Sequence, residues 1–186
     1  MKQEIKHSLA KLILGKTILY PTDTVWGLGC DATNEKAVSR IFEIKKRNES
    51  KSLVILVDGI EMLKKYVSDI PEEVVEILKT SERPTTIIYN DPIGLAKNVI
   101  AKDNTVAIRI VKHDFCQKVI ETLGNPLVST SANISGMPTP NSFKEIDESI
   151  LEAVDYVVNL QLEKITTIPS RIIKISDNGA IVVIRD

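Results

Sequence analysis

The chain has 186 residues, of which 43% are hydrophobic and 26% are charged, and this composition is typical of a folded globular protein rather than a disordered or fibrous one. Lys and Arg number 24 against 25 Asp and Glu, for a net charge of -1, which excludes a surface that is positive all round but not a local basic cavity. No apolar run reaches the ~18 residues of a membrane span, and the first residues lack the apolar stretch of a signal peptide. Cys30 and Cys116 have no metal-ligand spacing. We therefore expect the two cysteines to be buried small residues of a cytoplasmic protein. From the chain length we expect a single domain, residues 1–186.

Four segments in the first half of the chain carry the sequence signals of a helix. In the first two, apolar residues recur every three or four positions, and Gly15 stands where a glycine often ends a helix. In the other two, acidic residues stand at capping spacing, Asp58 with Glu61 and Asp69 with Glu72. The predicted helices cover residues 2–14, 34–47, 58–66 and 69–79.

Short β-prone segments are distributed over the whole chain. One of them, residues 53–57, is apolar at every position, which is typical of a strand covered on both faces. Asp177-Asn178-Gly179 predicts a hairpin turn between the last two. The predicted strands cover residues 17–20, 53–57, 85–89, 106–110, 127–131, 156–158, 171–175 and 180–184. Because helices alternate with strands early and strands follow one another late, we expect an α/β (α+β) fold with helices around a twisted mixed sheet.

Two familiar kinds of site do not fit this pattern. Gly15-Lys16-Thr17 resembles the end of a P-loop, but Ala10 stands where the first glycine belongs, and a helix precedes the segment where a strand should. His7 and His113 are the only histidines, and no cysteine or carboxylate cluster accompanies them. A histidine-based triad or a zinc site is therefore not expected.

Three segments concentrate polar side chains next to predicted strands. Residues 20–32 combine hydroxyls and a carboxylate with two glycines that let the backbone approach a ligand closely, although a polar turn with an aromatic plug explains them equally well. Residues 45–51 hold four cations against Glu49, with a solvated helix end as the alternative. Residues 126–140 are rich in hydroxyl groups. Cations with neutral donors suit a polyanion such as a nucleotide triphosphate.

These segments give nearly the whole chain a resemblance to the YrdC-type threonylcarbamoyl-AMP synthases. The loop at residues 21–29 is similar to the opening loop of the family, Lys45-Lys46-Arg47 matches its Lys-x-Arg motif, and Ser131-Ala132-Asn133 matches its Ser-x-Asn motif. The order, spacing and strand-end placement of the three make the match specific. Further similar segments are Thr105-Val106-Ala107-Ile108-Arg109, Pro169-Ser170 and Arg185, whereas Asn48, Arg83-Pro84 and Arg171 depart from the family pattern.

The resemblance implies the short form of the family, with a single YrdC-like domain and a concave, basic cavity. It implies a nucleotidyltransferase that makes L-threonylcarbamoyladenylate and pyrophosphate from L-threonine, bicarbonate and ATP, with Mg²⁺ on the triphosphate. The product would serve the threonylcarbamoyl modification of adenosine in tRNA, so the expected partners are threonylcarbamoyl transferase proteins, with tRNA or double-stranded RNA as a further possibility and no membrane. Two alternatives stay open: an RNA-binding module that uses the same cavity without catalysis, and a paralogue that takes another amino acid.

Carried over position by position, the family's site residues form two groups. The resemblance implies a catalytic role and ATP contact for Lys45, Arg47, Ser131 and Asn133, and ATP contact alone for Lys51, Thr105, Thr139 and Arg185. It implies threonine contact for Thr24, Arg109, Ser129 and Ser170. We expect Arg109 to pair with the amino-acid carboxylate; the alternative places Arg109 on an edge strand, pointing into solvent.

Overall fold

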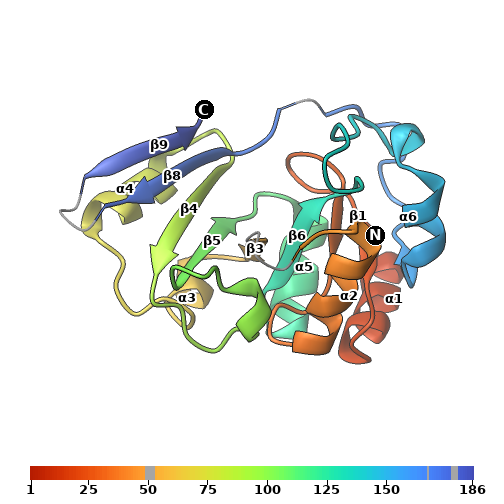
Figure 1. Cartoon of the computed structure of the whole chain (residues 1–186), viewed down its shortest axis with the longest axis horizontal. Coiled ribbons are helices and arrows are strands. Elements are labelled where there is room, and N and C mark those ends of the chain that lie inside the picture. Colours follow the sequence, from red (N-terminus) through yellow and green to blue (C-terminus); the bar gives the residue numbers. More distant parts are fainter. Residues whose placement is uncertain (49–52, 167, 177–179) are drawn as a thin grey trace.

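A mixed β-sheet forms the centre of the molecule. In the computed structural model, which describes residues 1–48, 53–166, 168–176 and 180–186, the strands are β1 (Ile18–Tyr20), β2 (Gly27–Gly29), β3 (Val54–Val57), β4 (Thr85–Asn90), β5 (Thr105–Ile110), β6 (Leu127–Ser131), β7 (Tyr156–Val157), β8 (Arg171–Ile175) and β9 (Ile181–Arg185). Their order is β7-β1-β2-β6-β3-β5-β4-β8-β9 (Figure 1). The pairs β7–β1, β3–β5 and β4–β8 are parallel, and the other neighbours are antiparallel. The expected mixed sheet is confirmed.

Helices surround this sheet. They are α1 (Lys2–Ile13), α2 (Glu35–Lys45), α3 (Ile60–Leu63), α4 (Glu72–Thr80), α5 (Asp114–Leu123) and α6 (Glu148–Ala153), with short 3-10 turns η1 (Lys97–Val99) and η2 (Phe143–Glu145). Helix α1 packs against α5 and β1, and α2 packs against β2 and α6. Within the described residues, no helix combines the length and the apolar character needed to cross a bilayer.

The helix ends show which local signals decide the structure. Gly15, with φ at 69°, ends α1 as predicted, and the side chain of Asn34 accepts the N–H of Ala37 to begin α2. The two predicted capping pairs are wrong, because α3 begins after Gly59 and α4 begins after Pro71, both without a side-chain capping bond. Asp58 and Asp69 stand one and two positions before those N-cap residues, too early to cap. Helices α5 and α6 were not predicted, and β2 lies inside a segment that was expected to be a loop.

The buried core lies on both sides of the sheet. Ile55, Leu56 and Val57 of β3 are fully buried, which confirms that this strand is covered on both faces. Cys30 and Cys116 are buried and free, as expected. The predicted turn at residues 177–179 lies outside the described residues, but β8 and β9 on either side of it pair antiparallel.

A long connection carries the chain from β7 to the far side of the sheet. It runs across the top of the molecule in Figure 1 and leads into β8. Because β8 pairs with β4 and β9 pairs with β8, the last residues of the chain come to lie opposite the loop between β1 and β2. The space between them is the candidate site.

Candidate active site

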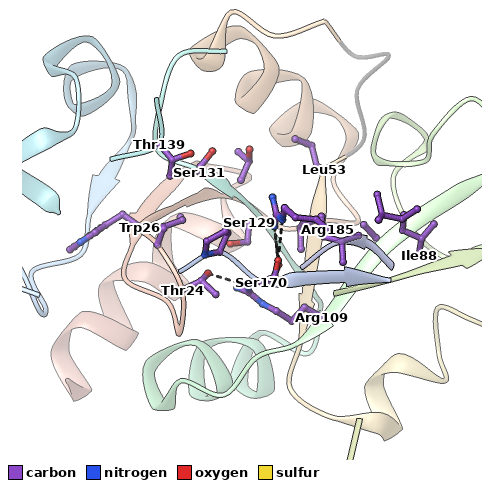
Figure 2. Close-up of a pocket in the computed structure, with 18 of the residues that line it drawn as sticks. Thr24, Trp26, Leu53, Ile88, Arg109, Ser129, Ser131, Thr139, Ser170 and Arg185 are labelled. Atoms are coloured by element: carbon purple, nitrogen blue, oxygen red, sulfur yellow. Dashed lines mark hydrogen bonds between the residues drawn. The ribbon is translucent and has the colours of Figure 1, made fainter. Parts of the chain in front are cut away.

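A cavity of about 420 Å³ opens between the middle of the sheet and the β8–β9 hairpin (Figure 2). This volume falls in the range of small-molecule sites. Its walls come from the β1–β2 loop, the segment after α2, β3, β4, β5, β6 and β8–β9. The predicted site residues that line it are Thr24, Arg47, Arg109, Ser129, Ser131, Thr139, Ser170 and Arg185.

The lining of this cavity is basic. Arg47, Arg109 and Arg185 contribute positive charge, and the described residues that line the cavity include no Asp or Glu. The other polar groups are mainly hydroxyls, which can donate to an anion or accept from an amine. The cavity therefore suits a small ligand with several negative charges, and it agrees with the concave, basic cavity that the family resemblance implies.

Two residues of the β1–β2 loop hold the side chain of Arg109 in place. Its side chain is 4% exposed; Nη2 forms an ion pair with Oδ1 of Asp23 at 3.0 Å, and Nη1 donates to Oγ1 of Thr24 at 3.0 Å. The alternative of an edge-strand residue pointing into solvent is wrong, because β5 lies between β3 and β4. Thr24 is itself fixed, since its backbone N–H donates to the hydroxyl oxygen of Thr22 at 3.0 Å. The guanidinium thus has a defined position at the cavity floor.

Ser170, just before β8, and Arg185, at the end of β9, bring the last part of the chain to the cavity. The Ser170 hydroxyl shares a hydrogen bond of 2.8 Å with the hydroxyl of Thr86 on β4. Arg185 donates from Nη2 to the carbonyl oxygen of Ser170 at 2.8 Å and from Nε at 3.1 Å. Burial, followed by the charges of Arg109 and Arg83, lowers the pKa of Arg185. The charge of Arg109 therefore acts on Arg185 within the same cavity.

Lys45 lies behind the cavity instead of lining it. Its side chain is buried at the end of α2, where Nζ donates to the carbonyl oxygens of Ser131 and, at 2.6 Å, Asn133. Burial, followed by the charge of Arg47, lowers the pKa of Lys45 to about 7. The backbone N–H of Ser135 also donates to the carbonyl oxygen of Lys45 at 2.8 Å. The two short motifs, Lys-x-Arg and Ser-x-Asn, are therefore parts of one hydrogen-bonded unit.

The remaining predicted residues lie elsewhere. Asn133 turns into its own loop, where Nδ2 donates to the carbonyl oxygen of Met137 at 2.6 Å, and it lines a smaller neighbouring cavity of about 210 Å³ that shares Thr139. Thr105 stands at the start of β5 and donates to Asp103 at 2.8 Å; the cavity lining does not include it. Lys51 lies outside the described residues.

The two glycines of the opening loop have a structural explanation. A Cβ on Gly29 would lie 1.9 Å from the carbonyl oxygen of Val128, and a Cβ on Gly27 would lie 2.9 Å from Oγ of Ser129. Gly29 therefore lets β2 approach the neighbouring sheet backbone closely, while Gly27 leaves room around Ser129 at the cavity wall. Both glycines thus make room for other atoms of the protein, and Gly27 in addition lines the cavity.

Sequence reasoning missed two features of the site. Asp23 was part of the polar opening segment, yet no role was assigned to it. The apolar wall was not predicted at all: Leu53, Ile88, Ile172 and Ile184 line the cavity. Asp23 could have been identified by its place between two threonines, whereas nothing local marks which apolar strand residues face a cavity. Within the described part of the chain, no three His, Cys, Asp or Glu side chains gather as a metal site.

Comparisons with known proteins agree with this geometry. The family model Sua5_yciO_yrdC, described as "Telomere recombination", matches residues 11–186. A threonylcarbamoyl-AMP synthase from Pseudoalteromonas translucida is 35% identical over 158 residues, which are 83% of this chain and 84% of that protein. The structure of P. abyssi Sua5 complexed with L-threonine is 29% identical with a TM-score of 0.89, and the match covers 100% of this chain but 54% of that one, so the chain spans about half of that protein. E. coli YciO shares the fold, with a TM-score of 0.86, 22% identity, and coverage of 100% of this chain and 90% of that one.

Proposed function

The chain belongs to the Sua5/YciO/YrdC family, and from this premise we propose that it makes L-threonylcarbamoyladenylate and pyrophosphate from L-threonine, bicarbonate and ATP. The single observation that carries the proposal is the cavity, whose lining, in the part of the chain that the structure describes, combines three arginines with several hydroxyl groups and no acidic residue. ATP and bicarbonate are anions, and threonine carries a carboxylate group, so each substrate has negatively charged oxygens that this environment favours. The similarity to a threonylcarbamoyl-AMP synthase over most of both chains supports the same reaction.

We assign the lower part of the cavity to the amino acid. Thr24, Arg109, Ser129 and Ser170 lie together there in Figure 2, with Arg109 at the floor. A guanidinium suits a carboxylate because two N–H groups can donate in parallel. The similar P. abyssi Sua5 structure is a complex with L-threonine, and the match between the two folds covers the whole of this chain and 54% of that one.

We assign the upper part to the nucleotide. Ser131 and Thr139 lie near one another in Figure 2, and Arg47 also lines the cavity. Arg47 would hold phosphate oxygens, and Arg185, between the two regions, would complete the binding of ATP. Lys45 and Asn133 would act by fixing the turn that carries Ser131. Contacts of ATP with Lys51 and Thr105 stay predictions.

The reaction needs positioning and charge neutralisation more than covalent help from the protein. The amine of threonine and bicarbonate first form a carbamate with loss of water. A carbamate oxygen then attacks the α-phosphorus of ATP, the bond from that phosphorus to the bridging oxygen breaks, and pyrophosphate leaves with the electron pair. Mg²⁺ would neutralise the triphosphate, and because the described lining residues offer no carboxylate, phosphate oxygens and water would be its ligands.

The cavity favours this enzyme over a module that binds double-stranded RNA. Such a module contacts phosphates over a wide surface that spans successive grooves, whereas the three arginines here line a space of about 420 Å³. The product is a mixed anhydride that a threonylcarbamoyl transferase would pass on to tRNA adenosine. We therefore propose the transferase as the partner, and RNA as a ligand of the later step.

The proposal is tested by pyrophosphate release from ATP and bicarbonate with each amino acid in turn, and by mass spectrometry of the adenylate. We expect release that depends on threonine and bicarbonate. Arg47→Ala should lower it strongly, while Lys46→Ala is the matched control because Lys46 is exposed and absent from the cavity lining. Release with another amino acid and not with threonine would identify a paralogue, and RNA binding without any release would contradict an enzyme.

A further inference from the structure

Asp23 is the acidic side chain that forms an ion pair with Arg109 of the cavity lining. It stands between Thr22 and Thr24 in the β1–β2 loop, and its side chain is 7% exposed. It does not line the cavity, and a direct contact with the ligand is therefore not its role.

Two segments of the chain hold the Asp23 carboxylate from different sides. Oδ1 pairs with Nη2 of Arg109 at 3.0 Å, and Oδ2 accepts the backbone N–H of Lys112 at 3.1 Å. Both partners belong to β5 and the residues just after it. The carboxylate thus links the loop at the cavity floor to the strand that carries Arg109, and it cannot turn without losing one of the two contacts.

The position and the orientation of the Arg109 guanidinium plane are consequently both fixed. Asp23 holds Nη2 through the ion pair at 3.0 Å, although Oδ1 has no hydrogen-bond partner among the described residues, and the adjacent Thr24 accepts from Nη1 at 3.0 Å. A planar group held at two nitrogens by consecutive residues has little freedom to rotate. Nε of Arg109 is buried and has no hydrogen-bond partner within the protein. A buried donor without a partner is costly, and a bound carboxylate would provide the missing acceptor.

The charge of Asp23 also matters to the other arginines. The described residues that line the cavity bring three guanidinium groups and no carboxylate. Asp23 offsets one of these charges from behind, so that Arg109 can stay buried near Arg185. A single carboxylate thus neutralises Arg109 enough for burial while it leaves the cavity net positive.

On the basis of the proposed function, we propose that Asp23 is a positioning residue, which orients Arg109 for the carboxylate of the amino-acid substrate. Its removal should affect the amino acid and spare the nucleotide. We expect Asp23→Asn to raise the apparent KM for threonine by about tenfold or more, the scale of one charge-assisted hydrogen bond lost between a displaced Arg109 and the substrate carboxylate. The KM for ATP should stay within about twofold, since the guanidinium that moves is not assigned to the nucleotide.

The experiment measures KM and kcat for both substrates by pyrophosphate release, together with Tm, for Asp23→Asn, Arg109→Gln and the double variant. The matched control is Asp155→Asn, whose carboxylate also joins remote segments by accepting from Thr17 at 2.8 and 2.9 Å. This control should lower Tm and leave both KM values unchanged. Because Asp23 acts through Arg109, the double variant should be no worse for threonine than Arg109→Gln alone.

Distinct results overturn the role of Asp23. A threonine KM that is unchanged or lower in Asp23→Asn, an equal rise for both substrates, or additive effects in the double variant would each do so; tighter threonine binding would show that Asp23 competes for Arg109. If Asp23→Asn fails to fold, the threonine KM of the double variant is compared with that of Arg109→Gln. A higher KM in the double variant would then overturn the role of Asp23. A wild-type protein that releases no pyrophosphate with threonine would overturn the proposed function itself, and with it the substrate.

Discussion

Lys45 should give the protein a pH-dependent stability that a neutral residue of similar size cannot. The side chain is 1% exposed, and burial, followed by the charge of Arg47, lowers its pKa from 10.5 to about 7. In the unfolded chain the ammonium returns to its ordinary pKa. Between these two values the unfolded state binds more protons than the folded state, so the free energy of unfolding rises with pH in that window. Below it, the full cost of burying the charge is present.

The variant Lys45→Met removes the titrating group. Since one pKa unit corresponds to about 1.4 kcal/mol, the wild type should gain about 2 kcal/mol of stability relative to the variant between about pH 6 and about pH 8.5. For a chain of this length, that free energy corresponds to roughly 4–8 °C in Tm. Calorimetry at both pH values measures it, with Lys46→Met as the exposed control.

The same variant separates two roles for Lys45. Its loss removes the side-chain donor to the carbonyl oxygen of Asn133 and one of two donors to that of Ser131, which also accepts the backbone N–H of Asn133 at 2.9 Å. An acceptor left unpaired in this way costs about 1–3 kcal/mol at every pH. Turnover should fall because Ser131 loses its support. Tm curves of wild type and Lys45→Met that run parallel with pH would refute the lowered pKa. Lost turnover with an unchanged Tm would refute the structural role and favour direct contact with ATP.

Three further predictions concern the cavity and the sheet beside it. Arg47→Ala should cost about 2–4 kcal/mol of transition-state stabilisation, the scale of one preorganised donor, whereas Lys46→Ala should change turnover little; turnover within twofold of wild type for Arg47→Ala would return Arg47 to a solvated helix end. Gly29→Ala should cost at least about 3 kcal/mol in chemical denaturation because its Cβ would meet the carbonyl oxygen of Val128 at 1.9 Å, while Gly59→Ala, with nothing within 4 Å, is the control. Serine should be rejected by only about 1–3 kcal/mol in kcat/KM and valine by more; equal rates for threonine and valine would show that no group binds the substrate hydroxyl.

Most of the element order could be predicted, because the signals are local. The apolar spacing before Gly15 and the fully apolar run at β3 each specify an element without reference to the rest of the chain. Local signals failed where two neighbouring residues could each mark the start of a helix. Asp58 with Glu61 has capping spacing, yet the helix begins after Gly59, and a difference of one residue decides whether a side chain can reach the helix N–H groups. Strand β2 was missed because its residues, Gly27–Gly29, have low strand propensity.

The candidate site likewise has features that the sequence predicts and features that it does not. The types of residue it needs, cations and hydroxyls at the ends of strands, are visible in the motifs, and most of them line the cavity. The motifs do not reveal that Lys45 supports the turn at Ser131 from behind, or that Asn133 faces its own loop. Both facts depend on where the end of α2 docks, and docking is a property of packing.

The sequence by itself determined which residues could do the chemistry and the periodicity of the helices and strands. Only the tertiary structure decided which of those residues meet. Asp23 and Arg109 are far apart in the chain, and they pair because β5 lies inside the sheet and the β1–β2 loop closes over its end. The apolar wall of Ile88, Ile172 and Ile184 exists because β8 adds to β4 and β9 to β8. Strand pairing between remote segments is set by register and by the burial of whole faces, and these are sums over many residues that no short motif contains.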